Sequence, residues 1–398
     1  MSNRPPIRLK VIVIALPLLL WVFVESALAL PRFSMRVGVQ CITCHVNPSG
    51  GGMRTEAGTL YSQMSLPYKP SLRIAGEKFS PKINEFFTLG TDLRIMAFDD
   101  DRGTTSIFPM QADFYFSAVL TDKITLYYDQ GFRRGLDFNN FEMFALAKVL
   151  PFQGYVKAGK FVPAFGWKLD NHTAFIRGGN SSTAGAGARS PTFADNTDGI
   201  GFSQIDKDAA VEIGFYPANG SIQLAVLNGG RGSTTDFDNN SGKAFSSRAE
   251  YIFDFEVVRA TLGSSFYTSD ESSSLETIYG THFGANWKKF TYLGEVDWAT
   301  LDDEIGQEGV RRGVRRTASY HELDYLVIRG VDLKFVYEFI DPDREIRDDS
   351  LTRLTGGVEF FPLPHQEIRF EYRHTMGNRL VNPDADLNEV ILMYHVFF

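Results

Sequence analysis

The two cysteines of this chain stand in a single motif, Cys41-Ile42-Thr43-Cys44-His45. The C-x-x-C-H spacing is typical of c-type haem attachment. On a helix, two thiols three residues apart lie about one turn from each other and can form thioethers to the two vinyl groups of a haem. The histidine that follows is then placed to bind the iron as proximal ligand. The motif therefore predicts one covalently bound haem c held by Cys41, Cys44 and His45.

Three other kinds of chemistry use closely spaced cysteines. A redox dithiol normally follows a strand of a thioredoxin-like domain, and nothing before residue 41 predicts such a domain. A zinc site needs four ligands, and no second Cys/His pair lies nearby in the sequence. A disulfide within the motif stays open in an oxidising compartment, but it leaves His45 without a role.

The second axial ligand of the iron is expected on a helix after the glycine-rich loop 48–52. One apolar face is predicted there by residues at helical spacing, namely Met53, Ala57, Leu60, Tyr61 and Met64. A methionine thioether would raise the reduction potential of the haem. We expect Met64 rather than Met53, because the tight glycine turn leaves Met53 little chain to reach the far haem face. The alternatives are His172, another barrel residue or water, with both methionines only packing on the haem edge.

The beginning of the chain predicts an export signal. Arg4, Arg8 and Lys10 precede the apolar stretch 11–24, and Ala27-Leu28-Ala29 provides the small residues that a signal peptidase reads. We expect cleavage after Ala29. An uncleaved anchor is the alternative, although an apolar core of 14 residues is short for a bilayer. The net charge of −8 and the lack of a basic cluster argue against nucleic-acid binding.

The composition of the chain favours β structure. A bundle of membrane helices needs several long apolar runs, whereas this sequence has one short run at its start. The 34 Phe and 16 Tyr argue against disorder. From residue 84 onward, apolar and polar residues alternate with the period of a strand. One such segment alternates Ile368, Phe370 and Tyr372 with Glu367, Arg369, Glu371 and Arg373.

The connections between these segments also alternate in length. Short turns at 121–122, 151, 287–288, 329–330 and 362–364 interleave with longer polar connections at 98–105, 229–244, 301–313, 341–350 and 377–386. This sidedness is typical of an outer-membrane barrel with periplasmic turns and external loops. The last segment alternates up to Phe398, the pattern that outer-membrane assembly machinery is thought to recognise in its clients.

The predicted fold is therefore an all-β transmembrane antiparallel barrel of about 16–18 strands. Counting the segments gives 17, whereas a barrel with both ends on one side of the membrane needs an even number. Either the count misses a strand near 173–178 and the true number is 18, or one strand is counted as two and the true number is 16. The Gly- and Ser-rich stretch 178–190 either folds inward as a constriction or forms an external loop.

These patterns divide the chain into a signal peptide (1–29), a helical c-type haem segment (30–69), a linker (70–83) and the barrel (84–398). A haem segment of about 40 residues cannot enclose its cofactor alone. Because the linker is short, this segment is expected at the periplasmic mouth of the barrel or inside its lumen.

The whole arrangement resembles the fused outer-membrane monohaem cytochrome-porins of iron-oxidising bacteria. The resemblance rests on Ala29-Leu30-Pro31-Arg32-Phe33, the C-x-x-C-H motif, Gly58 and Tyr61 in the following helix, and a barrel ending on Phe398. It implies oxidation of extracellular Fe(II) and electron transfer to periplasmic cytochromes. After His45 this chain has Asn47-Pro48-Ser49-Gly50-Gly51-Gly52-Met53-Arg54, where iron-oxidising members carry a Phe-Gly-Arg type segment. The segment 159–166 also resembles phosphate-selective porins.

Three functions follow from these expectations. The first is an electron conduit across the outer membrane, with ferrous iron as donor and with Asp99, Asp100 and Asp101 gathering cations on the outer side. The second is a diffusion porin whose lumen charges select solutes, with a structural or sensing haem. The third is a conduit that exports electrons to an external acceptor. We place inward transfer before outward transfer, and either before a porin.

Overall fold

The structure is a computed structural model that describes residues 31–70, 80–132, 140–169, 171, 173–177, 200, 206–229, 241–271, 274–305, 311–380 and 385–398. The predicted signal peptide, His172 and the stretch 178–190 lie outside the described residues. None of the described helices is long and apolar enough to cross a membrane.

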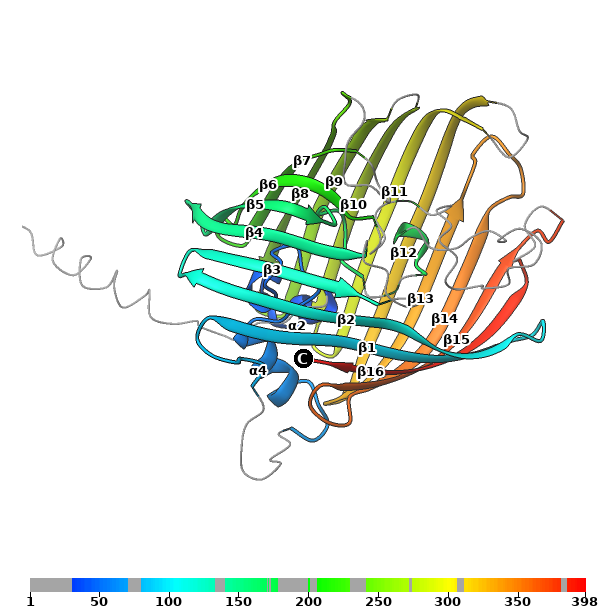
Figure 1. Ribbon diagram of the computed structural model, residues 1–398. Helices are drawn as coiled ribbons and strands as arrows, with labels where there is room; N and C mark the ends of the chain where they lie inside the picture. Colours follow the sequence, from blue (N-terminus) through cyan, green and yellow to red (C-terminus); the bar gives the residue numbers. More distant parts are fainter. Residues whose placement is uncertain are drawn as a thin grey trace, which may run out of the picture.

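Sixteen antiparallel strands form a closed barrel, in which each strand pairs with its neighbours in the chain (Figure 1). The barrel closes between the first and last strands, from Asp92 opposite Phe397 to Asp100 opposite Glu389. The strands are β1 (Phe87–Asp100), β2 (Thr105–Thr121), β3 (Ile124–Gly131), β4 (Phe141–Leu150), β5 (Gly154–Phe161), β6 (Asp208–Phe215), β7 (Gly220–Leu227), β8 (Ala244–Asp254), β9 (Val258–Glu271), β10 (Ser274–Trp287), β11 (Phe290–Ile305), β12 (Arg311–Ile328), β13 (Val331–Asp341), β14 (Leu351–Phe360), β15 (Gln366–Gly377) and β16 (Leu387–Phe397).

The prediction of a closed antiparallel barrel is confirmed, with 16 strands. The alternative of a further strand near 173–178 is wrong, because Phe175–Arg177 form the 3-10 helix η1. All three of its residues are buried. The backbone N–H of Phe175 donates to Glu338 Oε1 at 3.0 Å, so a side chain of the wall replaces the backbone ladder that a strand would need.

The strands show an inverted burial pattern. On β15, Phe370 is 48% exposed whereas Arg369 is 6% and Glu371 8% exposed. The apolar face therefore lies outside and the charged face inside, as the alternation predicted. In water this arrangement would leave apolar side chains uncovered, so it fits a barrel whose outer face contacts lipid.

A segment that we name the plug (residues 31–66) fills the end of the barrel where the short turns lie, with its first helix inside the lumen and its last helix at the mouth (Figure 1). It contains α2 (Pro31–Val37), α3 (Cys41–Cys44) and α4 (Glu56–Met64). Arg36 forms two hydrogen bonds to Asp332 at the start of β13, at 2.6 and 3.0 Å. Arg32, only 2% exposed, approaches Glu359 to 2.5 Å. Buried ion pairs of this kind fix the plug in one register against the wall.

A second internal segment, which we name the strap (residues 162–177, of which 170 and 172 are not described), crosses the lumen after β5. Its backbone N–H groups donate hydrogen bonds to side chains of the wall: Val162 N–H donates to Glu142, and Gly166 N–H donates to Ser265. Farther round the wall, the guanidinium of Arg353 on β14 donates to the carbonyl of Thr173. The strap therefore reaches from β5 across to β14 and closes part of the lumen.

Candidate haem site inside the barrel

The C-x-x-C-H motif forms one helical turn with an extended residue after it. His45 ends α3 at φ −118° and ψ 147°, and its N–H donates to the carbonyl of Cys41 at 3.0 Å. The chain then turns through the glycine loop and returns, so that His45 pairs with Arg54 in an isolated antiparallel bridge. Gly50, Gly51 and Gly52 all have positive φ, a conformation that favours glycine. The loop therefore brings the chain back beside His45.

The two thiols are free and largely withdrawn from water. Burial, followed by the negative charge of Glu250, raises the pKa of Cys41 to about 11. Burial, followed by Cys41, raises the pKa of Cys44 well above its usual range. Both are therefore neutral thiols at pH 7 in the absence of a bound group. The described residues include no group of three or more His, Cys, Asp or Glu side chains arranged to hold a metal ion.

A cavity lies between the plug and the wall formed by β1–β4, β15 and β16. It contains about 1400 Å³ of empty space, part of it open to solvent. His45, only 4% exposed, lines it. The apolar part of the lining comes from both plug and barrel: Phe33, Leu66, Met110, Phe361 and Phe397.

The cysteines stand directly behind this lining. A Cβ added to Gly50, which lines the cavity, would lie 3.4 Å from Cys41 Sγ. Cys44 packs in one apolar cluster with Phe33 and Phe397, which also line the cavity. A Cβ added to Gly58 would lie 2.4 Å from the carbonyl oxygen of Cys44, so only glycine fits there. The donor set and the adjoining cavity therefore fit a covalently attached haem.

The methionines lie differently from what the helical spacing predicted. The helix exists as α4, with Thr55 as N-cap accepting from Gly58 N–H at 3.3 Å. It buries Gly58, Thr59, Ser62 and Gln63, whereas Met64 is 51% exposed and does not line the cavity. This placement does not support Met64 as the second axial ligand. Met53 is 1% exposed, in the cluster that contains Tyr127.

The substitution Met64→Leu tests this placement. We expect the variant to keep the visible spectrum and reduction potential of the wild type, because an exposed side chain of similar volume is exchanged. A visible spectrum of the purified ferric and ferrous forms checks this. Loss of a methionine–iron absorption band in the variant alone would restore Met64 as ligand.

Helix α4 rests on the turn between β14 and β15 through His365. The ring nitrogens lie 3.3 Å from Ser62 Oγ and 3.2 Å from Gln63 Nε2. Burial, followed by the positive charge of Arg54, lowers the pKa of His365 from 6.5 to about 4. The ring is therefore neutral in the folded protein at pH 7.

This pKa shift predicts a pH-dependent stability. Since the unfolded chain takes up a proton near pH 6.5 and the folded chain only near pH 4, stability is full above pH 6.5 and falls as the pH decreases toward 4. His365→Gln should make the urea midpoint less sensitive to pH between 7 and 4.5 than in the wild type. If the urea midpoints of the two proteins changed in the same way with pH, His365 would not contribute to the pH dependence of stability.

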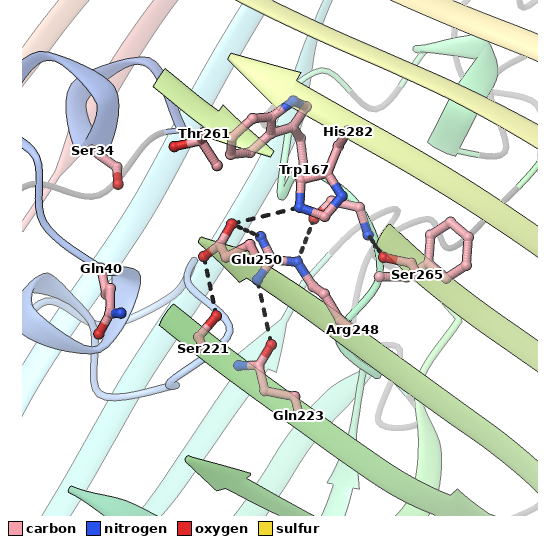
Figure 2. A network of polar contacts seen from close by, with 12 residues as sticks. Ser34, Gln40, Trp167, Ser221, Gln223, Arg248, Glu250, Thr261, Ser265 and His282 are labelled. Atoms are coloured by element: carbon pink, nitrogen blue, oxygen red, sulfur yellow. Dashed lines mark hydrogen bonds and ion pairs between the residues drawn. The ribbon is translucent and has the colours of Figure 1, made fainter. Parts of the chain in front are cut away.

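A polar network joins the strap and the wall, with Gln40 of the plug nearby (Figure 2). Arg248 donates to Glu250 at 2.6 Å and to the carbonyl of Gly166 at 2.8 Å. His282 lies 3.5 Å from the same Glu250 carboxylate and 5.0 Å from the Trp167 ring, between ring centroids. Because Glu250 also acts on the Cys41 thiol, the network connects the strap electrostatically to the attachment motif. Local sequence patterns contained no signal for it.

The acidic run 99–101 lies at the opposite end of β1 from the plug. Asp100 Oδ1 accepts from the N–H of Arg102 and of Thr104, so it shapes the β1–β2 turn. Asp101 accepts a hydrogen bond from Asn388 on β16. Asp99 and Asp101 stay exposed, and the idea that the run gathers cations remains a prediction.

Solved structures resemble this barrel, although no protein-family model matches the chain and no curated protein matches it significantly. Outer-membrane expressed OmpT of Vibrio cholerae is 12% identical, with a TM-score of 0.53 over 80% of this chain and 100% of OmpT. A porin refined at 1.8 Å resolution is 14% identical, with a TM-score of 0.53 over 78% of this chain and 100% of the porin. The fold is that of an outer-membrane porin. The outer membrane channel DcaP of Acinetobacter baumannii, 13% identical, shares this porin fold with a TM-score of 0.50 over 78% of this chain and 97% of DcaP.

Proposed function

We propose that this porin-fold protein is an outer-membrane electron carrier with one covalent haem c in its plug. The observation that carries the proposal is the position of the C-x-x-C-H motif, which lies inside the lumen with His45 on the wall of a large cavity. In a diffusion channel, such a motif in the lumen would have only a structural or sensing role. A redox centre at this place serves a barrel that carries electrons.

The residues of the site have distinct roles in this proposal. Cys41 and Cys44 supply the thioether sulfurs, and His45 supplies the proximal nitrogen. Bound haem supplies one-electron chemistry by cycling between ferric and ferrous iron. The apolar part of the lining, from the plug and the barrel, would contact the macrocycle.

The porin fold also supports an orientation. In outer-membrane barrels the short turns and the two ends of the barrel chain face the periplasm. The plug lies at that end, beside the turn that contains His365. We therefore place the haem near the periplasmic mouth, where periplasmic cytochromes could exchange electrons with it.

The preferred direction is inward, from extracellular Fe(II) to a periplasmic cytochrome, with ferrous iron oxidase activity as the corresponding reaction. One haem cannot span a hydrocarbon layer of about 30 Å alone. The donor therefore has to enter the lumen from the loop side, as far as the strap. Outward transfer to an external acceptor uses the same geometry in reverse, and the direction depends on the reduction potentials of the partners.

A diffusion porin is the second candidate, because the fold is that of porins. The plug and the strap argue against it. Both occupy part of the lumen, and charged side chains such as Arg177 pair with the wall, here with Glu295 at 2.6 Å. In this alternative the haem is structural or a sensor.

The deciding experiment combines spectroscopy with conductance. The purified protein is oxidised and mixed with Fe(II) at neutral pH while the visible spectrum is recorded, and the same preparation is inserted into a planar bilayer. We expect rapid appearance of reduced c-type bands and little open-channel conductance. An unresponsive haem together with a large steady conductance would favour the porin, and a protein without haem would refute both versions of the proposal.

A further inference from the structure

Buried cations in this lumen generally have a carboxylate partner. Lys157 lies 2.8 Å from Glu212, with both side chains fully buried. Arg353 likewise lies 2.9 Å from Glu338. This pairing is expected, because a cation taken out of water without a counter-charge is strongly unfavourable. A cation that is buried or half-buried, as Arg54 and Lys168 are, therefore points to an anion supplied from elsewhere when it lacks such a partner.

Arg54 is one exception to this pattern. Its guanidinium lies 4.3 Å from the centre of the Phe397 ring, and its Nη1 is shielded from water with no hydrogen-bond partner in the part of the chain that the structure describes. Asp92, the carboxylate that most favours the charge of Arg54, is already engaged by His395 and by Arg94. Burial lowers the pKa of the Arg54 guanidinium.

Lys168, on the strap, is the second exception. Its Cε would lie 3.1 Å from a Cβ added to Gly51, so the side chain passes close to the glycine loop of the plug. Within the described ranges, Lys168 Nζ has neither a hydrogen bond nor an ion pair. Burial lowers its pKa as well. The other lysine of the cavity, Lys207, donates to Asn140 Oδ1 at 2.9 Å.

Both exceptions line the same cavity as His45 and flank the attachment motif. On one side, Gly50 lies between Cys41 and Lys168. A Cβ added to Gly50 would lie 3.4 Å from Cys41 Sγ and 3.9 Å from Lys168 Cβ. On the other side, a Cβ added to Gly58 would lie 3.2 Å from Arg54 Cβ, next to the carbonyl of Cys44. The cavity thus presents two positive charges that form no ion pair among the described residues, one on each side of the attachment motif. It also has carboxylates, among them Glu142, whose charge favours that of Lys168.

We propose that Arg54 and Lys168 bind the two propionate carboxylates of the haem that the motif attaches. This inference rests on the proposed function, since it requires a haem in the cavity. Two carboxylates supply the two missing counter-charges, through charge-assisted hydrogen bonds that gain strength where water is excluded. The two residues act as positioning residues, because they orient the macrocycle and do not bind the iron.

The test uses the full-length protein purified from cells that attach haem c. Arg54→Gln and Lys168→Gln each remove one charge, Arg54→Lys keeps the charge, and Lys82→Gln is the matched control, because Lys82 pairs with Glu56 on the exposed surface. Four properties are measured: covalent haem by mass spectrometry, haem content, reduction potential, and the propionate bending bands in resonance Raman spectra. Two separate Gln variants keep the test decisive when one of them fails to fold.

We expect both Gln variants to keep covalent haem, to shift the propionate bands and to lower the reduction potential, because a lost positive charge favours ferric iron. Arg54→Lys should restore most of the potential, and Lys82→Gln should match the wild type. Haem-loaded Gln variants with wild-type bands and potential would overturn the inference and leave the proposed function standing. Wild-type potentials that depend on added phosphate, with unchanged propionate bands in the variants, would assign the cations to a free anion instead. A wild type without covalent haem would refute the proposed function itself.

Discussion

Replacing Cys41 and Cys44 together by serine should give a barrel that still inserts into the outer membrane but contains no covalent haem. Serine keeps the size and the helical turn of α3 but cannot form a thioether. Since the plug is held by ion pairs such as Arg36 with Asp332, the wall contacts survive the change. Loss of the haem band after denaturing electrophoresis, with unchanged heat-modifiable mobility of the barrel, is the expected result.

The single substitution His45→Ala separates attachment from ligation. The thiols remain, so covalent haem is retained, but the proximal nitrogen is lost and the response to Fe(II) should disappear. Failure of either variant to insert would contradict the division into a barrel and a redox plug. A covalent haem that survives in the double serine variant would contradict the motif itself.

Arg177→Met should destabilise the protein more than any other single change in the strap. Arg177 lies 2.6 Å from Glu295 and 3.4 Å from Asp297, and both carboxylates are fully buried. Removing one partner of a buried ion pair typically costs about 3–5 kcal/mol, because the remaining charge is left without compensation. The free energy of unfolding should fall by that order in urea titrations of the detergent-solubilised protein.

Trp167 provides a local signal for the same change. Its backbone N–H donates to Glu295 at 2.7 Å, and Arg177 donates to its carbonyl at 2.9 Å. Release of the strap should therefore move the Trp167 emission to longer wavelength before the barrel unfolds. Adding Glu295→Gln and Asp297→Asn to Arg177→Met removes the unpaired charges and should recover much of the stability. Equal stability of Arg177→Met and the wild type would show that the strap is not held by this cluster.

The barrel could be predicted because its information is local. Each strand carries its own alternation, and the exposure of Phe370 beside the burial of Arg369 follows directly from it. The strand count was less certain, because the region after β5 has neither alternation nor a regular turn. There the chain is held by contacts such as Arg177 with Glu295, which are 118 residues apart in the sequence. No local pattern contains that information.

The lack of long-range information in local patterns also explains why the buried face of α4 was predicted only in part. Helical spacing alone favoured an apolar face with Leu60 and Met64, as if the helix met an apolar surface. The surface that it meets is the β14–β15 turn, where His365 contacts Ser62 and Gln63. Ser62 and Gln63 are therefore buried, whereas Leu60 and Met64 are exposed. Ala57 and Tyr61 of the predicted face do pack in the apolar cluster of the plug. By contrast, the haem assignment of the motif Cys41 to His45 depends only on spacing within one helical turn, and it stays a prediction.

The enclosure of the motif imposes an order on how the protein is made. Cys44 has no exposed surface, and it is covered by Phe361 and Phe397 from the barrel as well as by the plug. Phe397 is the last residue of β16, the strand that closes the cylinder on β1. An enzyme that modifies Cys44 has no access once that seam has formed. In the proposed function, cofactor attachment would therefore have to take place on the still unclosed chain, before insertion into the membrane.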